Sequence, residues 1–292
     1  MTGGEAVGRA RLLQVARTVK HRLMLAKKRV TPVIAPIRDV AYRSTDRLRP
    51  WTYQPGSLPQ SFVSARPKVG VANPPPVPSP IYVLWTGENA MSSNRAAALA
   101  DVRSKFDVTL VTPTNLSSWV LDDAPLHPAY ESLSLVHRAD YLRAYLMRHH
   151  GGTYLDIKHG YGDVVRAVDR LNSSPDLWMA GCREPGADTV AADDDATLRV
   201  LRRRHGSVLG MCAFASRPGS PLTIEWLDEV HHRLDLYLRE LEQHPGDALG
   251  LNPGYPIPWT GILGAVLHPL CLKYADRLLI DQSFMPGRTD YR

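Results

Sequence analysis

The sequence predicts an α/β protein in which a mostly parallel sheet is flanked by helices. The apolar runs 81–85 (IYVLW) and 107–111 (DVTLV) are typical of short buried strands. Residues 92–106 between them have apolar positions at helical spacing behind a serine cap. A strand, a helix and a strand within about 31 residues indicate a βαβ unit, whose two strands are parallel.

The segment 135–150 gives a third observation in favour of this class, because it is the clearest helix in the chain. It ends at Gly151 and Gly152, where a left-handed glycine cap and cations in the last turn are favourable. A strand at 153–157 follows directly. The apolar stripe of the helix consists of Leu135, Ala139, Leu142 and Leu146.

The rest of the chain continues the alternation of strands and helices, without an evident internal repeat. We expect strands at 177–181, 208–216 and 278–281, a long helix at 221–241 and a short helix around 262–266. Strands and helices that alternate in this way build open sheets, which bind ligands at the carboxyl ends of their strands.

Charge and proline content divide the chain into three parts. Residues 1–50 carry 12 Lys and Arg against 3 Asp and Glu, a balance of +9, whereas the whole chain carries +6, so the remaining residues are net acidic. The stretch 73–80 (NPPPVPSP) contains five prolines, which are stiff and lack an amide donor. We therefore predict a basic N-terminal arm over 1–72, partly helical or disordered, a proline-rich linker over 73–80, and one domain over 81–292.

The basic arm also bears on partners and location. Its leucines and valines alternate with Lys and Arg between residues 11 and 29, as in a basic amphipathic helix, and its apolar runs are too short to span a bilayer or to form a signal peptide. We expect a cytoplasmic protein, with peripheral contact between the arm and anionic membranes as one interpretation and a disordered leader as the other. The net acidic body argues against a dedicated nucleic-acid binder. Widely spaced Cys182, Cys212 and Cys271 fit buried thiols in a reducing compartment.

Polar side chains gather where the predicted helix 135–150 meets the following strand. Asp140 and Arg143 lie three residues apart and project from one side of the helix, and Asp156 ends the strand. Two carboxylates and a guanidinium at this edge suit sugar hydroxyls, a ribose and a diphosphate. From these residues alone, a surface Asp/Arg pair with a turn-capping aspartate is the favoured alternative.

The full string RADYLRAYLMRHHGGTYLD (138–156) resembles the glycosyltransferases with a DXD sugar-binding region, which include relatives of yeast initiating mannosyltransferases and of clostridial glucosylating toxins. Their pattern is Asp-x-x-Arg on a helix, an apolar stretch, Gly-Gly, an aromatic residue and Asp-x-Asp. The similarity extends at lower stringency over roughly residues 80–285. The positions in register are Asp140, Arg143, Gly151, Gly152, Tyr154 and Asp156, and the segments 81–87, 210–230 and 258–262 are also similar to family segments.

The resemblance implies a GT-A-like, Rossmann-like fold and a role for each matching residue. Asp140 and Arg143 would hold hydroxyls of the donor sugar, together with Tyr154 as a further substrate-binding residue. Asp156 would bind the ribose or the metal-linked diphosphate. Trp85 would lie near the nucleotide, although simple packing in the core explains this residue almost equally well.

The chain departs from the family pattern at Lys158, which stands where the second metal aspartate belongs. A Mn²⁺ or Mg²⁺ ion that prefers several hard oxygen ligands would be weakened or replaced by this ammonium group. We favour Asp156 and Lys158 as catalytic residues, with the lysine neutralising the departing diphosphate. The alternatives are that Lys158 faces solvent while Asp163 joins Asp156 as metal ligand, or that activity has been lost.

Two further polar groups are weaker candidates. The acidic run 193–195 is expected to cap a helix, although a loop over the active site could use one of these carboxylates for a metal. His231 and His232 are adjacent on a predicted helix and therefore face different ways, which makes them a poor metal pair.

The sequence leads to three hypotheses of function. The first is an enzyme that transfers a hexose from UDP- or GDP-sugar to a glycan or other hydroxyl acceptor, with retention at the anomeric carbon as the resemblance implies. The second is a catalytically inactive GT-A-like module that binds a sugar or nucleotide, which Lys158 favours. The third is a membrane- or nucleic-acid-binding protein led by its arm, which the acidic body disfavours.

Overall fold

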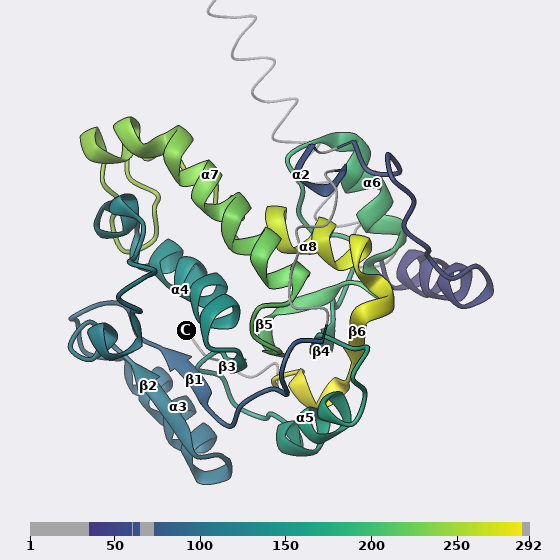
Figure 1. Cartoon of the computed structure of the whole chain (residues 1–292), viewed down its shortest axis with the longest axis horizontal. Helices are drawn as coiled ribbons and strands as arrows, with labels where there is room; N and C mark the ends of the chain where they lie inside the picture. The colour runs from purple at the N-terminus through teal and green to yellow at the C-terminus, as the bar shows by residue number, and fades with distance from the viewer. Residues whose placement is uncertain (1–34, 60, 65–72, 288–292) are drawn as a thin grey trace, which may run out of the picture.

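The computed structural model describes residues 35–59, 61–64 and 73–287. A six-stranded mixed sheet in the order β2-β1-β3-β5-β4-β6 forms the centre of the molecule (Figure 1). β5 is antiparallel to both of its neighbours, and the other neighbouring pairs are parallel. The predicted α/β class with a mostly parallel sheet flanked by helices is confirmed. The strands are β1 (Ile81–Leu84), β2 (Val108–Val111), β3 (Gly152–Leu155), β4 (Met179–Arg183), β5 (Leu209–Ser216) and β6 (Leu278–Ile280).

Helices cover both faces of this sheet and enclose two apolar cores. Successive residues of β1 alternate between them: Tyr82 packs on the side of α4, α7 and α8, whereas Ile81 and Val83 pack on the side of α3 and α5. This alternation is the period-two pattern of a strand buried on both faces. The helices are α2 (Ser61–Ser64), α3 (Ser93–Lys105), α4 (Leu135–His149), α5 (Val164–Asn172), α6 (Asp195–Arg203), α7 (Pro221–Gln243) and α8 (Gly264–Lys273), and residues 35–48 are also helical.

The turn between α4 and β3 requires its two glycines. Gly151 and Gly152 have φ of +66° and +98°, and a side chain on Gly152 would lie 2.7 Å from the carbonyl oxygen of Pro80. Only glycine adopts this backbone at no steric cost. The turn can therefore reverse the chain within two residues and place β3 directly beneath α4, as the sequence predicted.

Several predicted boundaries differ from the structure by one or two residues, such as the strand expected at 153–157, which ends at Leu155 and leaves Asp156 just beyond it, and one boundary differs by more. The short helix expected around 262–266 continues through Pro269 to Lys273 as α8, because its residues are all buried and their packing outweighs the loss of one backbone hydrogen bond. The strand expected at 177–181 runs instead from Met179 to Arg183, in register with β5 and β6.

Part of the segment assigned to the N-terminal arm packs against the domain. The indole nitrogen of Trp51 donates a hydrogen bond of 2.8 Å to the carbonyl oxygen of Leu272, and Leu58 and Val63 are fully buried in the larger core. In the linker, Val77 is buried and its backbone pairs with the side chain of Asn172. We therefore place the limit for a truncation that leaves the domain intact before residue 35 rather than at residue 72. The basic amphipathic pattern between residues 11 and 29 lies outside the described residues, and none of the described helices is long and apolar enough to cross a membrane.

This packing predicts that Leu58→Ala destabilises the protein. Truncating a fully buried leucine removes apolar contacts and leaves a cavity, which should lower the free energy of unfolding by about 3 kcal/mol. Leu48 lies on the same segment but is 84% exposed, so Leu48→Ala is the matched control and should change stability little. Urea unfolding of both variants measures the difference. Equal stability of the two variants would show that residues 51–64 do not belong to the folded domain.

Candidate functional site

The site lies where β1 and β3 end together. These strands are parallel, with Tyr82 opposite Tyr154, so their carboxyl ends meet at one edge of the sheet. Asp156 follows β3 at this edge, and its backbone N–H donates a hydrogen bond of 2.8 Å to the carbonyl oxygen of Cys212 on β5. The backbone of Asp156 is thus fixed by the neighbouring strand. Open α/β sheets bind ligands at this edge.

Five of the predicted residues form one connected cluster at this edge. Arg143 reaches down from α4, and its Nη1 lies 3.5 Å from Oδ1 of Asp140 while its Nη2 lies 3.3 Å from Oδ1 of Asp156. The hydroxyl of Tyr154 donates a hydrogen bond of 2.6 Å to the same oxygen of Asp156. The Nζ of Lys158 lies 2.8 Å from the other oxygen, Oδ2. Asp156 is therefore the shared ion-pair partner of the two cations in the cluster, Arg143 and Lys158.

The guanidinium of Arg143 is held in place by more than its ion pairs. It stacks over the ring of Tyr154, 4.5 Å from the ring centroid, and its Nη1 donates a hydrogen bond of 3.3 Å to the carbonyl oxygen of Met211. Its Nε is buried and has no hydrogen-bond partner within the described part of the chain. A buried donor without a partner is costly, so this nitrogen is a point of unsatisfied hydrogen bonding within the cluster.

The two aspartates differ in pKa because their surroundings differ. Burial raises the pKa of Asp140 to about 6; Arg143 opposes this shift, and the charge of Asp156 adds to it. Burial also acts on Asp156, but Arg143 and Lys158 outweigh it and hold the pKa of that carboxyl below its usual value. Asp140 is only 4% exposed and, among the described residues, has Arg143 as its one ion-pair partner. It is a buried carboxylate with acceptor capacity to spare.

Lys158 does not point into solvent. Its side chain is 18% exposed and its ammonium group faces Asp156, while its backbone N–H closes a tight turn on the carbonyl oxygen of Asp156 at 2.8 Å. Tyr161 supports the same carbonyl through its hydroxyl at 3.0 Å. The turn thus holds the lysine where the resemblance places a second metal aspartate.

The donor set at Asp156 does not fit a divalent cation. Mn²⁺ and Mg²⁺ require carboxylate oxygens with free lone pairs and several further hard ligands. Here Oδ1 of Asp156 accepts from Tyr154 and Arg143, and Oδ2 is paired with the ammonium of Lys158. A second cation beside Lys158 would also be repelled by its charge, so these residues do not fit Mn²⁺ or Mg²⁺.

Trp85 and Asp163 stand apart from the cluster in the described structure. The indole of Trp85, one residue beyond β1, donates a hydrogen bond of 2.8 Å to the carbonyl oxygen of Asn89 and packs on the smaller core. Asp163 is exposed and caps α5 by accepting a hydrogen bond of 3.0 Å from the backbone N–H of Arg166. No hydrogen bond or ion pair between described residues joins either side chain to Asp156.

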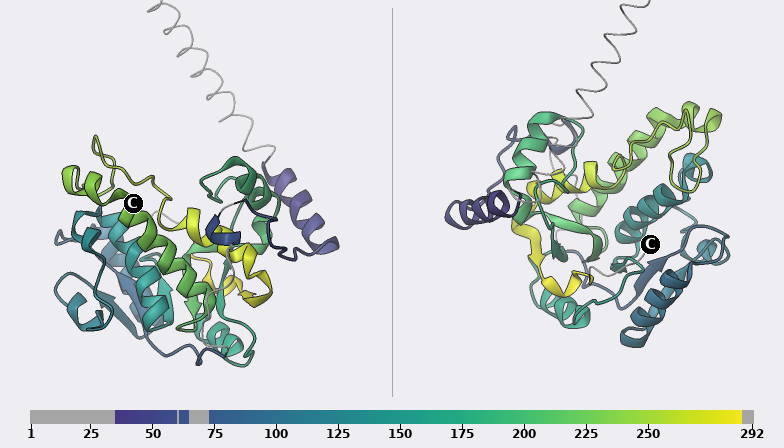
Figure 2. Two further views of the ribbon diagram at one scale, coloured as in Figure 1. Left: turned by 45° about the horizontal axis from the view of Figure 1, so that its top comes forward. Right: turned by 180° about the vertical axis from the view of Figure 1, so that it is seen from behind.

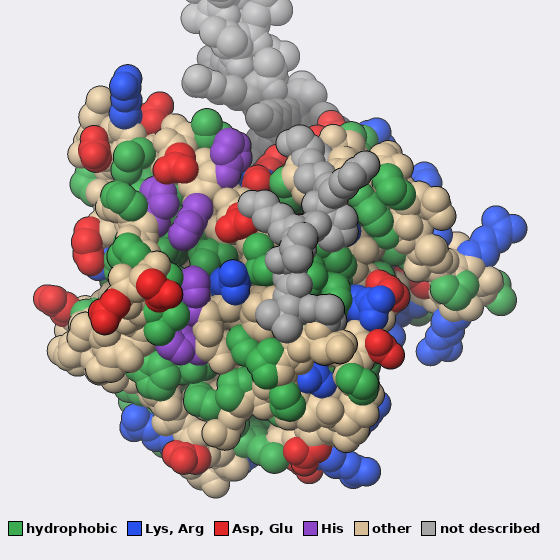
Figure 3. Space-filling model, viewed as in Figure 1, with side chains coloured by type: hydrophobic (Ala, Val, Ile, Leu, Met, Phe, Trp, Pro, Cys, Tyr) green, Lys and Arg blue, Asp and Glu red, His purple; other side chains and the backbone are tan. Residues whose placement is uncertain are grey.

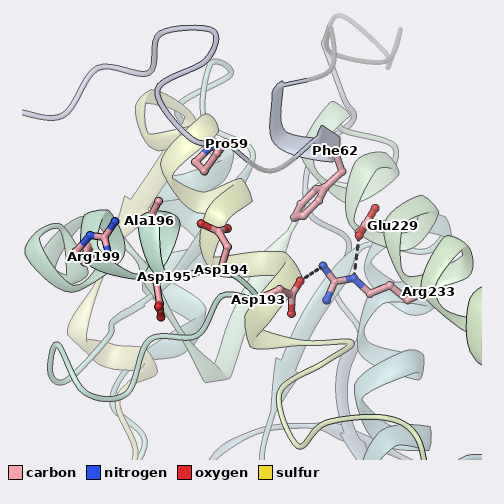
Figure 4. Close-up of a pocket in the computed structure, with 9 residues that line it drawn as sticks. All are labelled: Pro59, Phe62, Asp193, Asp194, Asp195, Ala196, Arg199, Glu229 and Arg233. Carbon is pink, nitrogen blue, oxygen red and sulfur yellow. Dashed lines mark hydrogen bonds and ion pairs between the residues drawn. The ribbon is translucent and has the colours of Figure 1, made fainter.

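The acidic run 193–195 lies beside a separate cavity of about 650 Å³ (Figure 4). Asp194 caps α6, as expected, and accepts from the backbone N–H of Thr197 at 2.8 Å. Asp193 pairs with Arg233 at 2.6 Å, and Arg233 in turn donates to the carbonyl oxygen of Gly261. This cavity does not include the Asp156 cluster. Its lining consists of Pro59, Phe62, Asp193, Asp194, Asp195, Ala196, Arg199, Glu229 and Arg233.

Nothing in the sequence indicates the contact between Cys182 and Cys212, the second of which lies next to the site. Cys182 and Cys212 are 30 residues apart, yet their sulfurs lie 3.9 Å apart, because they lie on the paired strands β4 and β5. Both are free thiols; Cys182 is buried as expected, whereas Cys212 is only partly buried.

His231 packs on Tyr141 with its Nε2 3.1 Å from the phenol, while His232 is exposed, so the two histidines face different ways as predicted.

The charge state of Asp140 predicts how stability depends on pH. An aspartate in an unfolded chain titrates near pH 3.9, so the native protein, with a pKa of about 6 at Asp140, binds this proton more tightly and loses stability as pH rises from about 4 to about 6. Asp140→Asn should remove this loss of stability and be more stable than wild type by about 3 kcal/mol above pH 7. Below pH 4 the two proteins should be alike.

Urea unfolding between pH 3.5 and 8 measures this difference. Asp101→Asn is the control, because a hydrogen bond from the backbone of Gly160 lowers the pKa of Asp101 and the sign should reverse. A stability difference between Asp140→Asn and wild type that is constant across this range would contradict the assigned pKa.

The chain is thus an α/β protein with a cluster of charged side chains at the carboxyl edge of a mostly parallel sheet. Comparison with protein-family models finds no match to the chain, and no curated protein matches it. A functional assignment therefore depends on the motif and on the geometry of the cluster.

Proposed function

We propose that the chain is a GT-A-like glycosyltransferase that transfers a hexose from UDP- or GDP-sugar to a glycan or other hydroxyl acceptor. The observation that carries the proposal is the cluster of Asp140, Arg143, Asp156 and Lys158 at the sheet edge. A nucleotide sugar combines hydroxyls, which carboxylates bind, with a diphosphate, which cations bind. The cluster offers both kinds of group at one place.

Asp140 and Arg143 are suited to the sugar. The carboxylate of Asp140 is buried, ionised above about pH 6 and not engaged by other donors than Arg143 among the described residues, so it can accept hydrogen bonds from sugar hydroxyls. Hydrogen bonds to a buried charge are stronger than bonds in water and would fix the ring orientation. Arg143 holds this carboxylate in position, with its Nη1 3.5 Å from Oδ1 of Asp140.

Lys158 and Asp156 are suited to the diphosphate end. When the bond between the anomeric carbon and the phosphate oxygen breaks, its electron pair leaves on the nucleoside diphosphate, and negative charge develops there. A fixed ammonium group next to this oxygen stabilises that charge without a metal ion. Asp156 orients the lysine through its ion pair at 2.8 Å. Transfer with retention at the anomeric carbon is what the resemblance implies.

A thermal-shift screen of nucleotide sugars tests the proposal. A ligand that binds only the native protein raises its stability, by about 2.7 kcal/mol at a concentration one hundred times Kd. We expect one UDP- or GDP-hexose to raise the melting temperature in the presence of chelator, and Asp140→Ala to abolish the shift. If no nucleotide sugar shifts the melting temperature of the wild type, the proposal is wrong.

A second candidate is a binding module without transfer activity. The ion pair between Lys158 and Asp156 favours it, because it removes the usual metal site. This module would bind a nucleotide sugar and show the same thermal shift, yet release no nucleoside diphosphate with or without an acceptor. Measuring product release alongside binding separates the two functions.

A further inference from the structure

Two cysteines are in contact at the edge of the sheet that carries the Asp156 cluster. Cys182 belongs to β4 and Cys212 to β5, and the sulfurs of these free thiols lie 3.9 Å apart. The two strands are neighbours within the sheet, which has helices on both of its faces (Figures 1 and 2). Backbones of neighbouring strands lie about 4.8 Å apart, and the Cα atoms of a disulfide lie about 4.4–6.8 Å apart. A bond that brings the sulfurs about 2 Å closer is therefore compatible with the pairing of these strands.

A bulge in β5 turns Cys212 toward Cys182. Phe214 packs in the larger core, and the alternation of a regular strand would place Cys212 on the same side. Cys212 and its neighbour Ala213 instead both pack on the smaller core, where Cys182 is buried. The pairing of β4 with β5 shifts register at this point, as a bulge requires. Bulges re-aim side chains next to functional sites, so the contact between the two thiols is a specific feature of this strand.

The two thiols differ in a way that suits a redox reaction. The hydrogen bond between the sulfurs lowers the pKa of the Cys182 thiol and raises the pKa of the Cys212 thiol. Cys182 therefore becomes the thiolate, which is the reactive form of a cysteine. Cys182 is fully buried, but Cys212 beside it is partly exposed and gives a small oxidant a route to the pair.

The surroundings favour an oxidant without charge. Acidic and basic side chains are mixed across the face shown in Figure 3, without a field of one sign that would concentrate an ionic oxidant. An ion would also lose its hydration on reaching a largely buried sulfur, which costs free energy. Hydrogen peroxide is small and uncharged, so it fits the approach to this pair.

The segment that carries Cys212 also holds the Asp156 cluster. The carbonyl oxygen of Cys212 accepts a hydrogen bond of 2.8 Å from the backbone N–H of Asp156, and that of Met211 accepts one of 3.3 Å from Nη1 of Arg143. The hydroxyl of Tyr161 lies 3.0 Å from the carbonyl oxygen of Asp156 and 3.4 Å from that of Cys212. A displacement of Cys212 therefore moves the acceptors that position both Asp156 and Arg143.

We propose that Cys182 and Cys212 form a redox-active pair that hydrogen peroxide converts into a disulfide, and that this bond loosens the hold of β5 on Asp156. The thiolate of Cys182 attacks a peroxide oxygen and breaks the O–O bond, which gives a sulfenic acid and a hydroxide that takes the proton of Cys212. The thiolate of Cys212 then attacks the sulfur of Cys182, and the S–O bond breaks to release a hydroxide that takes up a proton from solvent. The two thiols lose two electrons and two protons, and the peroxide becomes two waters. The inference does not rest on the proposed function.

Counting free thiols in the full chain tests the formation of the bond. The reduced chain has three cysteines, so we expect one free thiol after hydrogen peroxide, three after dithiothreitol, and a peptide pair linked through Cys182 and Cys212 in the mass spectrum. Cys271→Ala is the matched control and should still form the link, because Cys271 is buried in the larger core on the other face of the sheet. Cys212→Ser should form no link. Three free thiols after peroxide, or a link that involves Cys271, would overturn the inference.

Hydrogen exchange at the backbone amide of Asp156 tests the effect on the site. This amide donates to Cys212, so the disulfide should raise its exchange rate at least about tenfold in wild type and in Cys271→Ala. Peroxide should leave the rate unchanged in Cys212→Ser. The measurement needs no nucleotide sugar, so its result is independent of whether the chain is a glycosyltransferase. An unchanged exchange rate in a chain that has formed the disulfide would overturn the proposed effect on Asp156.

Discussion

Asp156→Asn is expected to reduce sugar transfer by at least about a thousandfold while the protein remains folded. The carboxylate pairs with both cations of the cluster, Arg143 and Lys158, and accepts the hydroxyl of Tyr154. An amide of the same shape keeps one acceptor but loses the charge that positions the guanidinium and the ammonium group. Both cations would then lack their common partner, and the diphosphate would meet a misplaced lysine.

The fold should survive this change because the backbone of Asp156 is held by Cys212 and its side chain lies at the sheet edge rather than in a core. Circular dichroism and a cooperative melt check this point. Asp163→Asn is the control, since Asp163 caps α5 outside the cluster and its loss should leave transfer unaffected at the cost of slight destabilisation. A folded Asp156→Asn protein with wild-type activity would show that the site lies elsewhere.

Lys158→Ala should have the second largest effect. Removal of a preorganised charge beside the leaving diphosphate costs about 2–4 kcal/mol of transition-state stabilisation, which lowers kcat/KM by roughly thirtyfold to a thousandfold. Wild-type activity should persist in chelator, because Asp156 already has both of its oxygens occupied. Lys105→Ala, which removes an exposed lysine paired with Asp101, is the control and should be silent.

Lys158→Asp supplies the converse test. It restores the pattern Asp-x-Asp, so whatever activity remains should depend on added manganese or magnesium. If wild type is inactive in chelator and Lys158→Ala is nearly silent, a metal held by Asp156 and another carboxylate is required. The lysine would then have no part in the reaction.

The sequence predicts the sheet edge well because its signals there are local. The apolar stripe of α4 and the diglycine turn lie next to each other in the sequence and can be recognised locally. In the structure Gly151 and Gly152 have positive φ, as the turn requires. Asp140, Arg143 and Asp156 then come together for geometric reasons alone, since a helix that reverses into a strand must lie over it. This part of the site needs no long-range information.

The features that sequence reasoning missed depend on contacts between distant segments. Nothing local indicates that Trp51 and Leu58 pack on α8 and the larger core, because the basic, proline-rich surroundings are those of a loose arm. The continuation of α8 past Pro269 likewise follows from burial, which overrides the usual effect of proline. The proximity of Cys182 and Cys212 arises from the pairing of β4 with β5.

The sequence alone does not determine whether the side chain of Lys158 faces solvent or the site, and the side-chain geometry does. The sequence allowed a lysine in solvent or a lysine in the site. The ammonium group lies 2.8 Å from Asp156 and takes up the oxygen that a metal would need. The ion pair between Lys158 and Asp156 is compatible with sugar transfer without a metal and also with binding of a nucleotide sugar without transfer. A measurement of turnover distinguishes these two functions.

The most direct measurement is the release of nucleoside diphosphate from UDP- and GDP-hexoses by the purified full chain in chelator. One donor should be hydrolysed slowly without an acceptor and faster with an added glycan, and Asp140→Ala, Asp156→Asn and Lys158→Ala should each suppress the release. Absence of release from every donor, in chelator and with manganese or magnesium alike, would contradict the assignment as a glycosyltransferase.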